Sequence, residues 1–517
     1  MNTNIMTGTN TMTGTNTMMG ANTMMGANTM MGANTMTGTN TMTGTNTPMT
    51  GTNTPMSTNA PTTNVVNTMV NKHNRYALSY IANDTFWGVG IENETYLECS
   101  EKKEVNKQFM LQNHKRDSKC LDYYFNYKKD VFNKCINKLF TDKDIIKLPI
   151  LMNAHSFLSH TIDGTKICYD TYKKNGTEYP QSLLIFLQEK NKYFLEEYGK
   201  KFVFDGDTIE FMTQKFYKAK IKDVVDELLY IKKEFITNVK NVFSEFNILK
   251  KYGDINICKQ NHGFATFLTN INNLGIFNNM TYHFNFTLPT KLNEQALVEN
   301  ENDFEYRHIK AIRILQYLTP LLLTRYGSPD ILSYANCCKV SPSSQRCALS
   351  RYIGIGSYDT NLPKEQRISN LTRIPKENKP TYWWYYLYKS DYVLSDMIGL
   401  DFNFNKYGNK NHGIEFRIFD YFDENLLCEL LEFFVYLFDH TYANEIDNPI
   451  YNETWNNLTL KIISEKEYVL SSAEIDMYNK LLNINIKNDY VVVCLQEIMD
   501  KIKHKYKLTG VYSKDMI

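Results

Sequence analysis

Four short segments of this 517-residue chain carry carboxylate, imidazole and guanidinium groups at alternating positions. The segments are residues 87–96, 208–212, 281–288 and 413–419. Their alternation with apolar residues predicts β-strands, whose successive side chains point to opposite faces. One face would then present Glu92, Glu94, Glu210, His283, Glu415 and Arg417. Solvated sheet faces usually carry Lys, Thr, Ser and Gln, whereas these groups suit divalent cations and an anionic nucleotide.

Glu92 and Glu94 stand two residues apart, so the roots of their side chains lie about 7 Å apart on one strand face. This spacing favours two neighbouring cation sites, each with one carboxylate, over a tight chelate of one ion. Mg²⁺ prefers oxygen ligands and keeps phosphate and water in its other positions. Gly88 and Gly90 share that face and predict an open floor for a ligand. The alternative is a surface acidic pair on an edge strand.

Glu210 and His283 extend the same pattern. Glu210 follows the turn expected at residues 205–207, and its alternative role is a solvated acid in a hairpin. His283 lies between two aromatic residues and would point away from them, onto the side that also carries Asn285. Its alternative role is that of a structural histidine whose hydrogen bonds are satisfied.

Glu415 and Arg417 form the most specific pair. Their strand is apolar on its other side, and burying two charges is costly unless both find partners. A guanidinium donates two parallel hydrogen bonds to carboxylate or phosphate. The pair therefore indicates an anion-binding position, and the alternative is a mutual ion pair.

From residue 75 onward the pattern is mixed α and β, with no clear linker, so residues 72–517 are predicted to form one catalytic domain. Apolar residues recur with helical spacing in seven segments, at 122–139, 181–198, 221–246, 305–326, 425–442, 474–483 and 491–506. The strongly apolar segment 425–442 is expected to pack on the back of the sheet. Loops are expected at 327–329, 341–344 and 405–411.

The N-terminal segment is a degenerate six-residue repeat of Met, Thr, Gly and Asn, over residues 1 to about 64. It carries no charge and no aromatic residue, and it cannot bury enough surface to offset the entropy of ordering its backbone. Residues 1–71 are therefore predicted to be a disordered tail. A β-solenoid or fibre would need inward-facing aliphatic residues that the repeat lacks.

Composition excludes several classes of protein. Fifty-seven Lys and Arg balance 56 Asp and Glu without a long basic stretch, which argues against nucleic-acid binding. Ten scattered Cys without zinc spacing favour reduced thiols in a cytosol-like compartment. No apolar run of about 18 residues and no signal peptide is present, so we expect a cytoplasmic protein that does not contact membranes.

Taken together, the segments resemble the glutamine synthetase and glutamate–cysteine ligase superfamily of carboxylate–amine ligases, especially its amidoligase branch. Three motifs follow in the family's order: GxExE at residues 90–94, an Asn-loop with a histidine at 278–283, and E-[FV]-R-F/I-x-D at 415–420. The resemblance implies an α+β fold. Its curved antiparallel sheet would have a polar catalytic face that binds ATP and two or three Mg²⁺ or Mn²⁺, with helices on the other face.

The resemblance also implies roles for single residues. By this likeness Glu94 and Glu210 hold one metal, and a second is held by Glu92, His283 and Glu415. Further roles fall to Arg417, Asn285, Asn278, Arg346 and Arg351.

Arg417 would contact the acid's carboxylate or the transferred phosphate, and Asn278 would bind the acid substrate. Asn285 stands where the family has a second histidine on the phosphate side, and it is assigned a catalytic role. Arg346 and Arg351 would bind nucleotide phosphates, although a surface basic loop explains them equally well. Residues 253–263 and 352–373 are candidates for a lid.

The implied reaction transfers phosphate from ATP to a carboxylate, and an amine then attacks the acyl phosphate to form an amide. Metal ions and arginines stabilise the charge that develops, and exclusion of water protects the intermediate. The substrates would be small-molecule or peptide carboxylates and amines. Two alternatives remain: a catalytically inactive structural or matrix protein on a ligase fold, and a phosphagen-type kinase that uses a similar sheet.

Overall fold

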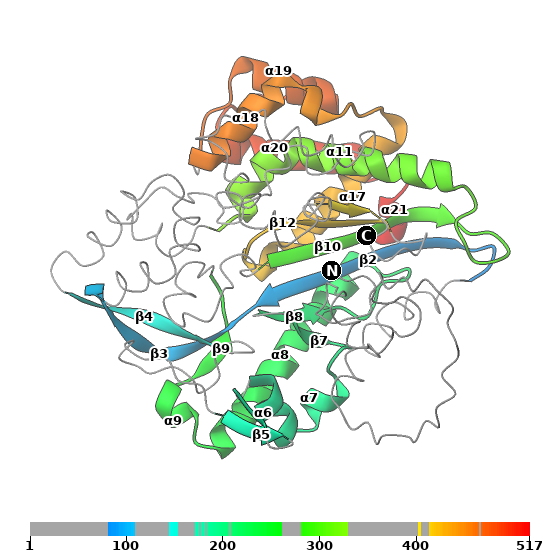
Figure 1. Cartoon of the computed structure of the whole chain (residues 1–517). Helices are drawn as coiled ribbons and strands as arrows, with labels where there is room; N and C mark the ends of the chain where they lie inside the picture. Colours follow the sequence, from blue (N-terminus) through cyan, green and yellow to red (C-terminus); the bar gives the residue numbers. More distant parts are fainter. Residues whose placement is uncertain are drawn as a thin grey trace, which may run out of the picture. The chain divides into compact units, whose positions relative to one another are not determined.

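The computed structural model describes ten stretches of the chain, all within the unit Val65–Ile517. They are residues 81–108, 144–152, 171–174, 177–180, 183–205, 208–260, 281–328, 402–404, 413–464 and 467–517. The repeat tail, the segment 122–139, and the loops predicted at 341–344, 352–373 and 405–411 lie outside these stretches. Helices and antiparallel strands are combined in the described residues, which confirms the predicted α+β class (Figure 1).

A six-stranded antiparallel sheet carries the predicted site residues. Its strands follow the order β11-β12-β10-β2-β8-β7, and every neighbouring pair runs antiparallel. The strands are β2 Thr85–Thr95, β7 Phe202–Asp205, β8 Thr208–Met212, β10 Thr281–Lys291, β11 Phe402–Phe404 and β12 Ile414–Phe419. The four segments predicted as strands are the four inner strands of this sheet. Each was therefore recognised from alternation alone, although they are spread over more than 300 residues.

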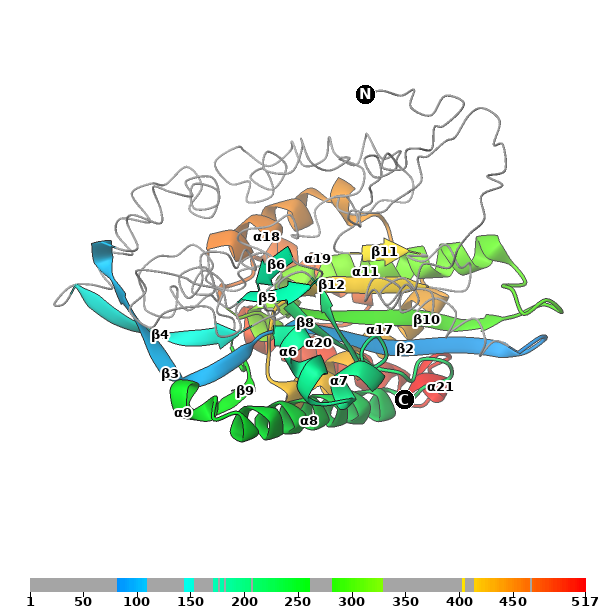
Figure 2. The same ribbon diagram turned by 60° about the horizontal axis from the view of Figure 1, so that its bottom comes forward.

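Helices α8 (Ile221–Glu245) and α17 (Leu427–Ala443) lie against the sheet (Figures 1 and 2). Their buried apolar residues belong to the same core cluster as those of the strands. Phe211 of β8 meets Phe235 of α8 with ring centroids 5.0 Å apart. Phe284 of β10 and Phe416 of β12 both meet Phe434 of α17, at 6.0 Å and 5.6 Å. The helix predicted at 425–442 therefore packs on the sheet as expected.

Helix α11 (Glu301–Tyr326) packs against α17 and also contacts β10 directly, where the Leu288 N–H donates to His308 Nε2 at 3.0 Å. Helix α20 (Val491–Tyr506) packs against both α11 and α17. Helix α19 (Ser472–Leu482) starts two residues earlier than predicted because Ser471 and Glu474 form a reciprocal N-terminal cap. None of the described helices is long and apolar enough to cross a membrane.

The helix predicted at 181–198 is wrong in one respect, because it is two short helices, α6 (Leu183–Lys190) and α7 (Tyr193–Glu196). The side chain of Asn191 accepts a hydrogen bond from the Tyr193 N–H at 3.0 Å. Asn side chains that bond to nearby backbone compete with the helical ladder, so the chain turns there.

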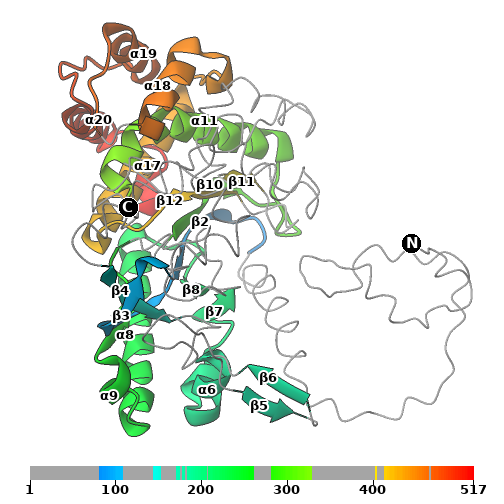
Figure 3. The same cartoon turned by 60° about the vertical axis from the view of Figure 1, so that its left-hand side comes forward.

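Several elements have no counterpart in the predictions. A three-stranded sheet has the order β4-β3-β9, with β3 Leu97–Asn106, β4 Ile145–Met152 and β9 Ile255–Ile257. A hairpin pairs β5 (Thr171–Lys174) with β6 (Thr177–Pro180) (Figure 3). The remaining helices are α9 Leu249–Tyr252, η7 Glu424–Leu426, η8 Pro449–Tyr451, α18 Glu453–Ser464 and α21 Ser513–Met516.

Candidate metal site on the main sheet

Strand register brings the predicted acids and the histidine together. His283 of β10 lies opposite Glu92 of β2, and Glu94 of β2 lies opposite Glu210 of β8. Glu415 of β12 lies opposite a further β10 residue, Asn285. Directly opposite residues of an antiparallel pair have neighbouring side chains on one face. The register therefore converts positions far apart in the sequence into neighbours.

His283 lies at the centre of this group. One ligand atom from each of Glu92, His283 and Glu415 lies within 4.8 Å of the other two. Its Nδ1 is 3.5 Å from Glu92 Oε2 and 3.9 Å from Glu415 Oε1. On the other side of the ring, Nε2 is 3.8 Å from Glu94 Oε1 and 3.2 Å from Thr281 Oγ1. The spacing allows two carboxylates and an imidazole to converge on one cation.

The four carboxylates of the group are buried. The exposed fraction is 0% for Glu415, 3% for Glu94, 6% for Glu210 and 7% for Glu92. Burial removes hydration from an ionised carboxylate, and neighbouring carboxylates repel one another. Two alternatives that the sequence left open are therefore wrong. Glu92 and Glu94 are not a surface pair on an edge strand, and Glu210 is not a solvated hairpin acid.

Arg417 places one positive charge beside these carboxylates. Its Nη1 donates to Glu415 Oε1 at 3.2 Å, so the ion pair considered as an alternative is formed. Burial by itself would lower the pKa of Arg417. The carboxylates of Glu415, Glu94 and Glu92 outweigh that effect and hold its pKa above the ordinary value. The guanidinium thus lies in a strongly negative field, which a bound cation would reduce.

Two polar atoms beside this group fit a bound ligand. Within the described part of the chain, Asn285 Oδ1 and Arg417 Nε are buried and have no hydrogen-bond partner. Buried polar atoms are almost always paired with protein, water or a ligand. An amide oxygen is a ligand for hard cations, and a guanidinium N–H donates to an anionic oxygen. Asn285 Oδ1 could therefore bind a cation, and Arg417 Nε could donate to an anion.

The open floor predicted at Gly88 and Gly90 is wrong, because the ring of Phe216 lies over both glycines. A Cβ at Gly88 would stand 2.2 Å from Phe216 Cε1, and a Cβ at Gly90 would stand 3.1 Å from Cδ2. Phe216 follows β8, and its carbonyl accepts a hydrogen bond from Val89 of β2 at 3.2 Å. The glycines make room for this ring, and their sequence spacing held no signal for it.

Thr281 is a site residue that the sequence interpretation missed. It precedes His283 by two residues, so strand alternation predicts that both point to the same side. That signal was available from the sequence. Three other predicted site residues, Asn278, Arg346 and Arg351, lie outside the described residues, as do the proposed lid at 352–373 and residues 261–263 of the other.

Comparison with known proteins gives the chain a relative. A protein of Acanthamoeba polyphaga mimivirus, described as "Uncharacterized protein R704", is 34% identical over 480 residues, which cover 89% of this chain and 82% of that protein. The chain belongs to the family of this mimivirus protein. No protein-family model matches the chain. Family membership extends over most of the sequence, and the chemistry has to be argued from the site.

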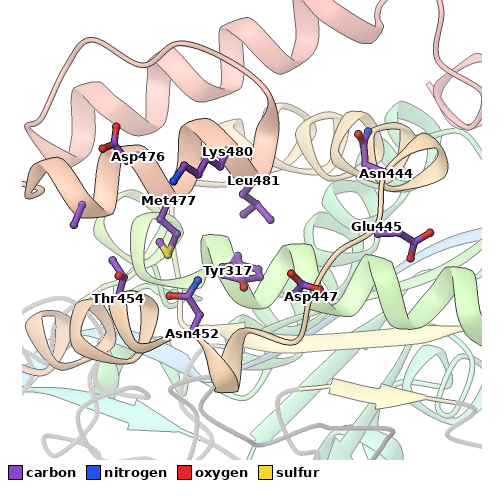
Figure 4. A pocket seen from close by; sticks show the side chains of 11 residues that line it. Tyr317, Asn444, Glu445, Asp447, Asn452, Thr454, Asp476, Met477, Lys480 and Leu481 are labelled. Carbon is purple, nitrogen blue, oxygen red and sulfur yellow. The ribbon is translucent and has the colours of Figure 1, made fainter.

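This chain also has a cavity of about 590 Å³, which lies among helices α11, α18 and α19, outside the main sheet (Figure 4). Tyr317, Asn452 and Met477 line it, together with Asp447, Asp476 and Lys480. None of the predicted site residues lines this cavity. The charged groups around it are exposed, in contrast to the buried carboxylates on the sheet.

Proposed function

We propose that this protein is an ATP-dependent ligase that joins a carboxylate to an amine on a curved polar sheet face holding two Mg²⁺ or Mn²⁺ ions. The observation that carries the proposal is the buried cluster of Glu92, His283 and Glu415, with Glu94 and Glu210 beside it. Buried acids at this spacing require positive charge. The resemblance of the motifs to amidoligases supports the choice of reaction.

In this proposal Glu92, His283 and Glu415 hold one cation, and Glu94 and Glu210 hold the other. Four carboxylates and one imidazole form a set dominated by hard oxygen donors, which favours Mg²⁺ or Mn²⁺ over softer metals. Bound at these positions, the cations would neutralise phosphate charge during phosphoryl transfer.

The chain's own residues would orient the reacting groups. Arg417, through the Nε–H that has no hydrogen-bond partner in the described residues, would bind the substrate carboxylate or the transferred phosphate. Asn285 would present its amide beside that position. An oxygen of the acid attacks the γ-phosphorus, ADP leaves, and the amine then displaces phosphate from the acyl carbon. Burial would keep water away from the acyl phosphate.

The remaining parts of the proposal follow from the resemblance. Asn278 would bind the acid substrate, and Arg346 and Arg351 would bind nucleotide phosphates. The acid and the amine would be small molecules or peptides. The scattered cysteines, read as reduced thiols, favour a reaction in the cytoplasm.

Turnover by the full-length chain tests the proposal. Purified protein is incubated with Mg²⁺, ATP and pooled acids and amines, and ADP and free phosphate are measured separately. We expect equal amounts of both, dependent on both substrates, and abolished by Glu92→Gln and by Glu415→Gln. Glu445→Gln serves as the matched control, because Glu445 is exposed and lines the cavity among the helices rather than the main sheet.

Two outcomes would contradict the ligase. ADP formation with a guanidine substrate and no free phosphate would favour the phosphagen-type kinase. No ADP, together with no heat of Mg–ATP binding in calorimetry, would favour the inactive structural protein.

A further inference from the structure

A buried lysine lies behind the carboxylate cluster, on the side of the sheet that α8 covers. Lys232 is in the middle of α8, and its side chain is 7% exposed. Its Nζ donates to Asn93 Oδ1 at 2.7 Å. Asn93 stands between Glu92 and Glu94 in β2 and points to the opposite face. The lysine therefore contacts the one residue that separates the two metal-site glutamates of this strand.

Asn93 also forms a hydrogen bond to the neighbouring strand β10. Its Nδ2 donates to the carbonyl oxygen of Thr281 in β10 at 3.1 Å. Thr281 and Glu94 are opposite each other in the register of β2 and β10. The hydrogen bond is thus added to the backbone ladder two residues along β10 from the position where His283 lies opposite Glu92.

Lys232 also contacts the connection that follows β12. Its Nζ forms an ion pair with Glu424 Oε1, at the start of η7. The ring of Tyr282 in β10 lies 5.8 Å from the same Nζ, and the Tyr282 hydroxyl donates to Glu424 Oε1 at 3.5 Å. One ammonium group thereby connects β2, β10 and the segment after β12. Glu92 and His283 lie on the first two of these elements, and Glu415 lies on β12, which ends at Phe419 shortly before Glu424.

Such a buried ion pair is weak evidence for stability. Desolvation of two charges offsets much of their attraction, and apolar replacements of both partners are often neutral or stabilising. Burial lowers the pKa of Lys232, and the Glu424 carboxylate opposes this shift only in part. The contacts of Lys232 are therefore better explained by the geometry that they impose on the strands.

We propose that Lys232 is a positioning residue for the metal site, because its bonds to Asn93 and Glu424 set how β2, β10 and β12 present Glu92, His283 and Glu415. The inference rests on the proposed function, since it concerns the same cation positions. It adds that divalent-cation affinity depends on a side chain that touches no ligand and lies on the opposite face of the sheet.

Mn²⁺ binding by the full-length chain tests this role. We compare wild type, Lys232→Met, Lys232→Met/Glu424→Gln and Asn93→Ala by calorimetry, and measure the stability of each by urea unfolding. Lys232→Met alone leaves Glu424 buried without its partner and is expected to lower the unfolding midpoint. The double variant removes both charges, so its midpoint should return close to that of wild type, while its Mn²⁺ affinity stays at least tenfold weaker.

Asn93→Ala removes the hydrogen bond between Lys232 and Asn93 but leaves the ion pair of Lys232 and Glu424 in place, so it tests the first contact separately. It too is expected to bind Mn²⁺ at least tenfold more weakly. Lys233→Met, at the exposed neighbouring position of α8, is the matched control and should bind Mn²⁺ as wild type does.

Two other outcomes would contradict the inference. Wild-type affinity in both the double variant and Asn93→Ala would overturn the positioning role and leave the metal site standing. Absence of Mn²⁺ binding by wild type would overturn the proposed metal site, and this inference with it.

Discussion

Two regions of the molecule gather several carboxylates, and they differ in how much water reaches them. On the main sheet, Glu415 and its three neighbouring glutamates are almost inaccessible. Around the cavity among α11, α18 and α19, Asp447 and Asp476 are exposed, and the side chain of Glu445 is 74% exposed beside Lys310 at 3.7 Å. Exposed acids stay hydrated, whereas buried acids lose hydration and repel one another. Burial, rather than the number of acids, distinguishes a candidate metal site.

The largest expected difference between the two regions is in cation affinity. Glu415→Gln removes one carboxylate of the cluster and should weaken Mn²⁺ binding at least 1,000-fold, or by about 4 kcal/mol. Asp447→Asn, at the cavity, should leave the affinity within about twofold of wild type. Calorimetry measures both, and comparable losses in the two variants would show that burial is the wrong criterion.

In the helical region, the buried side chain of His440 should make the free energy of unfolding depend on pH. Its Nε2 lies 2.9 Å from the carbonyl oxygen of Leu481, a cavity residue, and its Nδ1 lies 2.9 Å from the Tyr506 hydroxyl. Burial lowers its pKa from 6.5 to about 4. The folded state thus binds this proton less readily than the unfolded state, so the contribution is complete above pH 6.5. It is lost as pH falls toward 4, by about 3 kcal/mol in total.

Urea unfolding between pH 7 and pH 4.5 measures this contribution. His440→Gln should show a smaller loss of stability on acidification than wild type, by up to the stated amount. His504→Gln, at an exposed position of α20, is the control for loss of a histidine. Equal slopes for wild type and His440→Gln would mean that this buried imidazole does not limit stability in acid.

The effect of Glu92→Gln on the free energy of unfolding should have opposite signs without and with Mn²⁺. In EDTA, Glu92→Gln should raise the free energy of unfolding by about 1–2 kcal/mol, because it removes repulsion between buried carboxylates. In saturating Mn²⁺, wild type should be the more stable protein, because binding to the folded state adds stability. Urea unfolding in both buffers tests this, and a destabilised metal-free Glu92→Gln would argue that the acids are already neutralised by protein groups.

The smallest effect is expected at the cavity rim. Asp476→Asn should change the free energy of unfolding by less than about 0.5 kcal/mol with or without Mn²⁺, because its carboxylate is exposed. The same urea titrations provide the measurement. A larger change that depends on Mn²⁺ would place a cation at the cavity as well.

Local patterns predicted much of the fold. The segment 491–506 was predicted as a helix from apolar spacing, and α20 has those bounds. The strand at 413–419 was predicted from the alternation of Ile414, Phe416 and Ile418 with Glu415 and Arg417, and β12 spans six of those seven residues. Such patterns are visible because the period of a strand or helix is set by its own backbone.

Strand register and tertiary packing could not be predicted from such local patterns. Nothing within either strand states that His283 pairs with Glu92, and the ring over Gly88 comes from the segment after β8. The adjacent lysines Lys232 and Lys233 look alike in sequence, yet the first is buried and the second exposed.

The sequence by itself determined which residues could act as metal ligands and which strands would present them, because alternation is a local property. The tertiary structure decided that Glu92, His283 and Glu415 converge, that they are buried, and that Lys232 lies behind them. Those facts depend on strand pairing and on a helix packed across it, between residues far apart in the chain. The short distances between the ligand atoms and the burial of their side chains make these residues a candidate site, and both arise only from that packing.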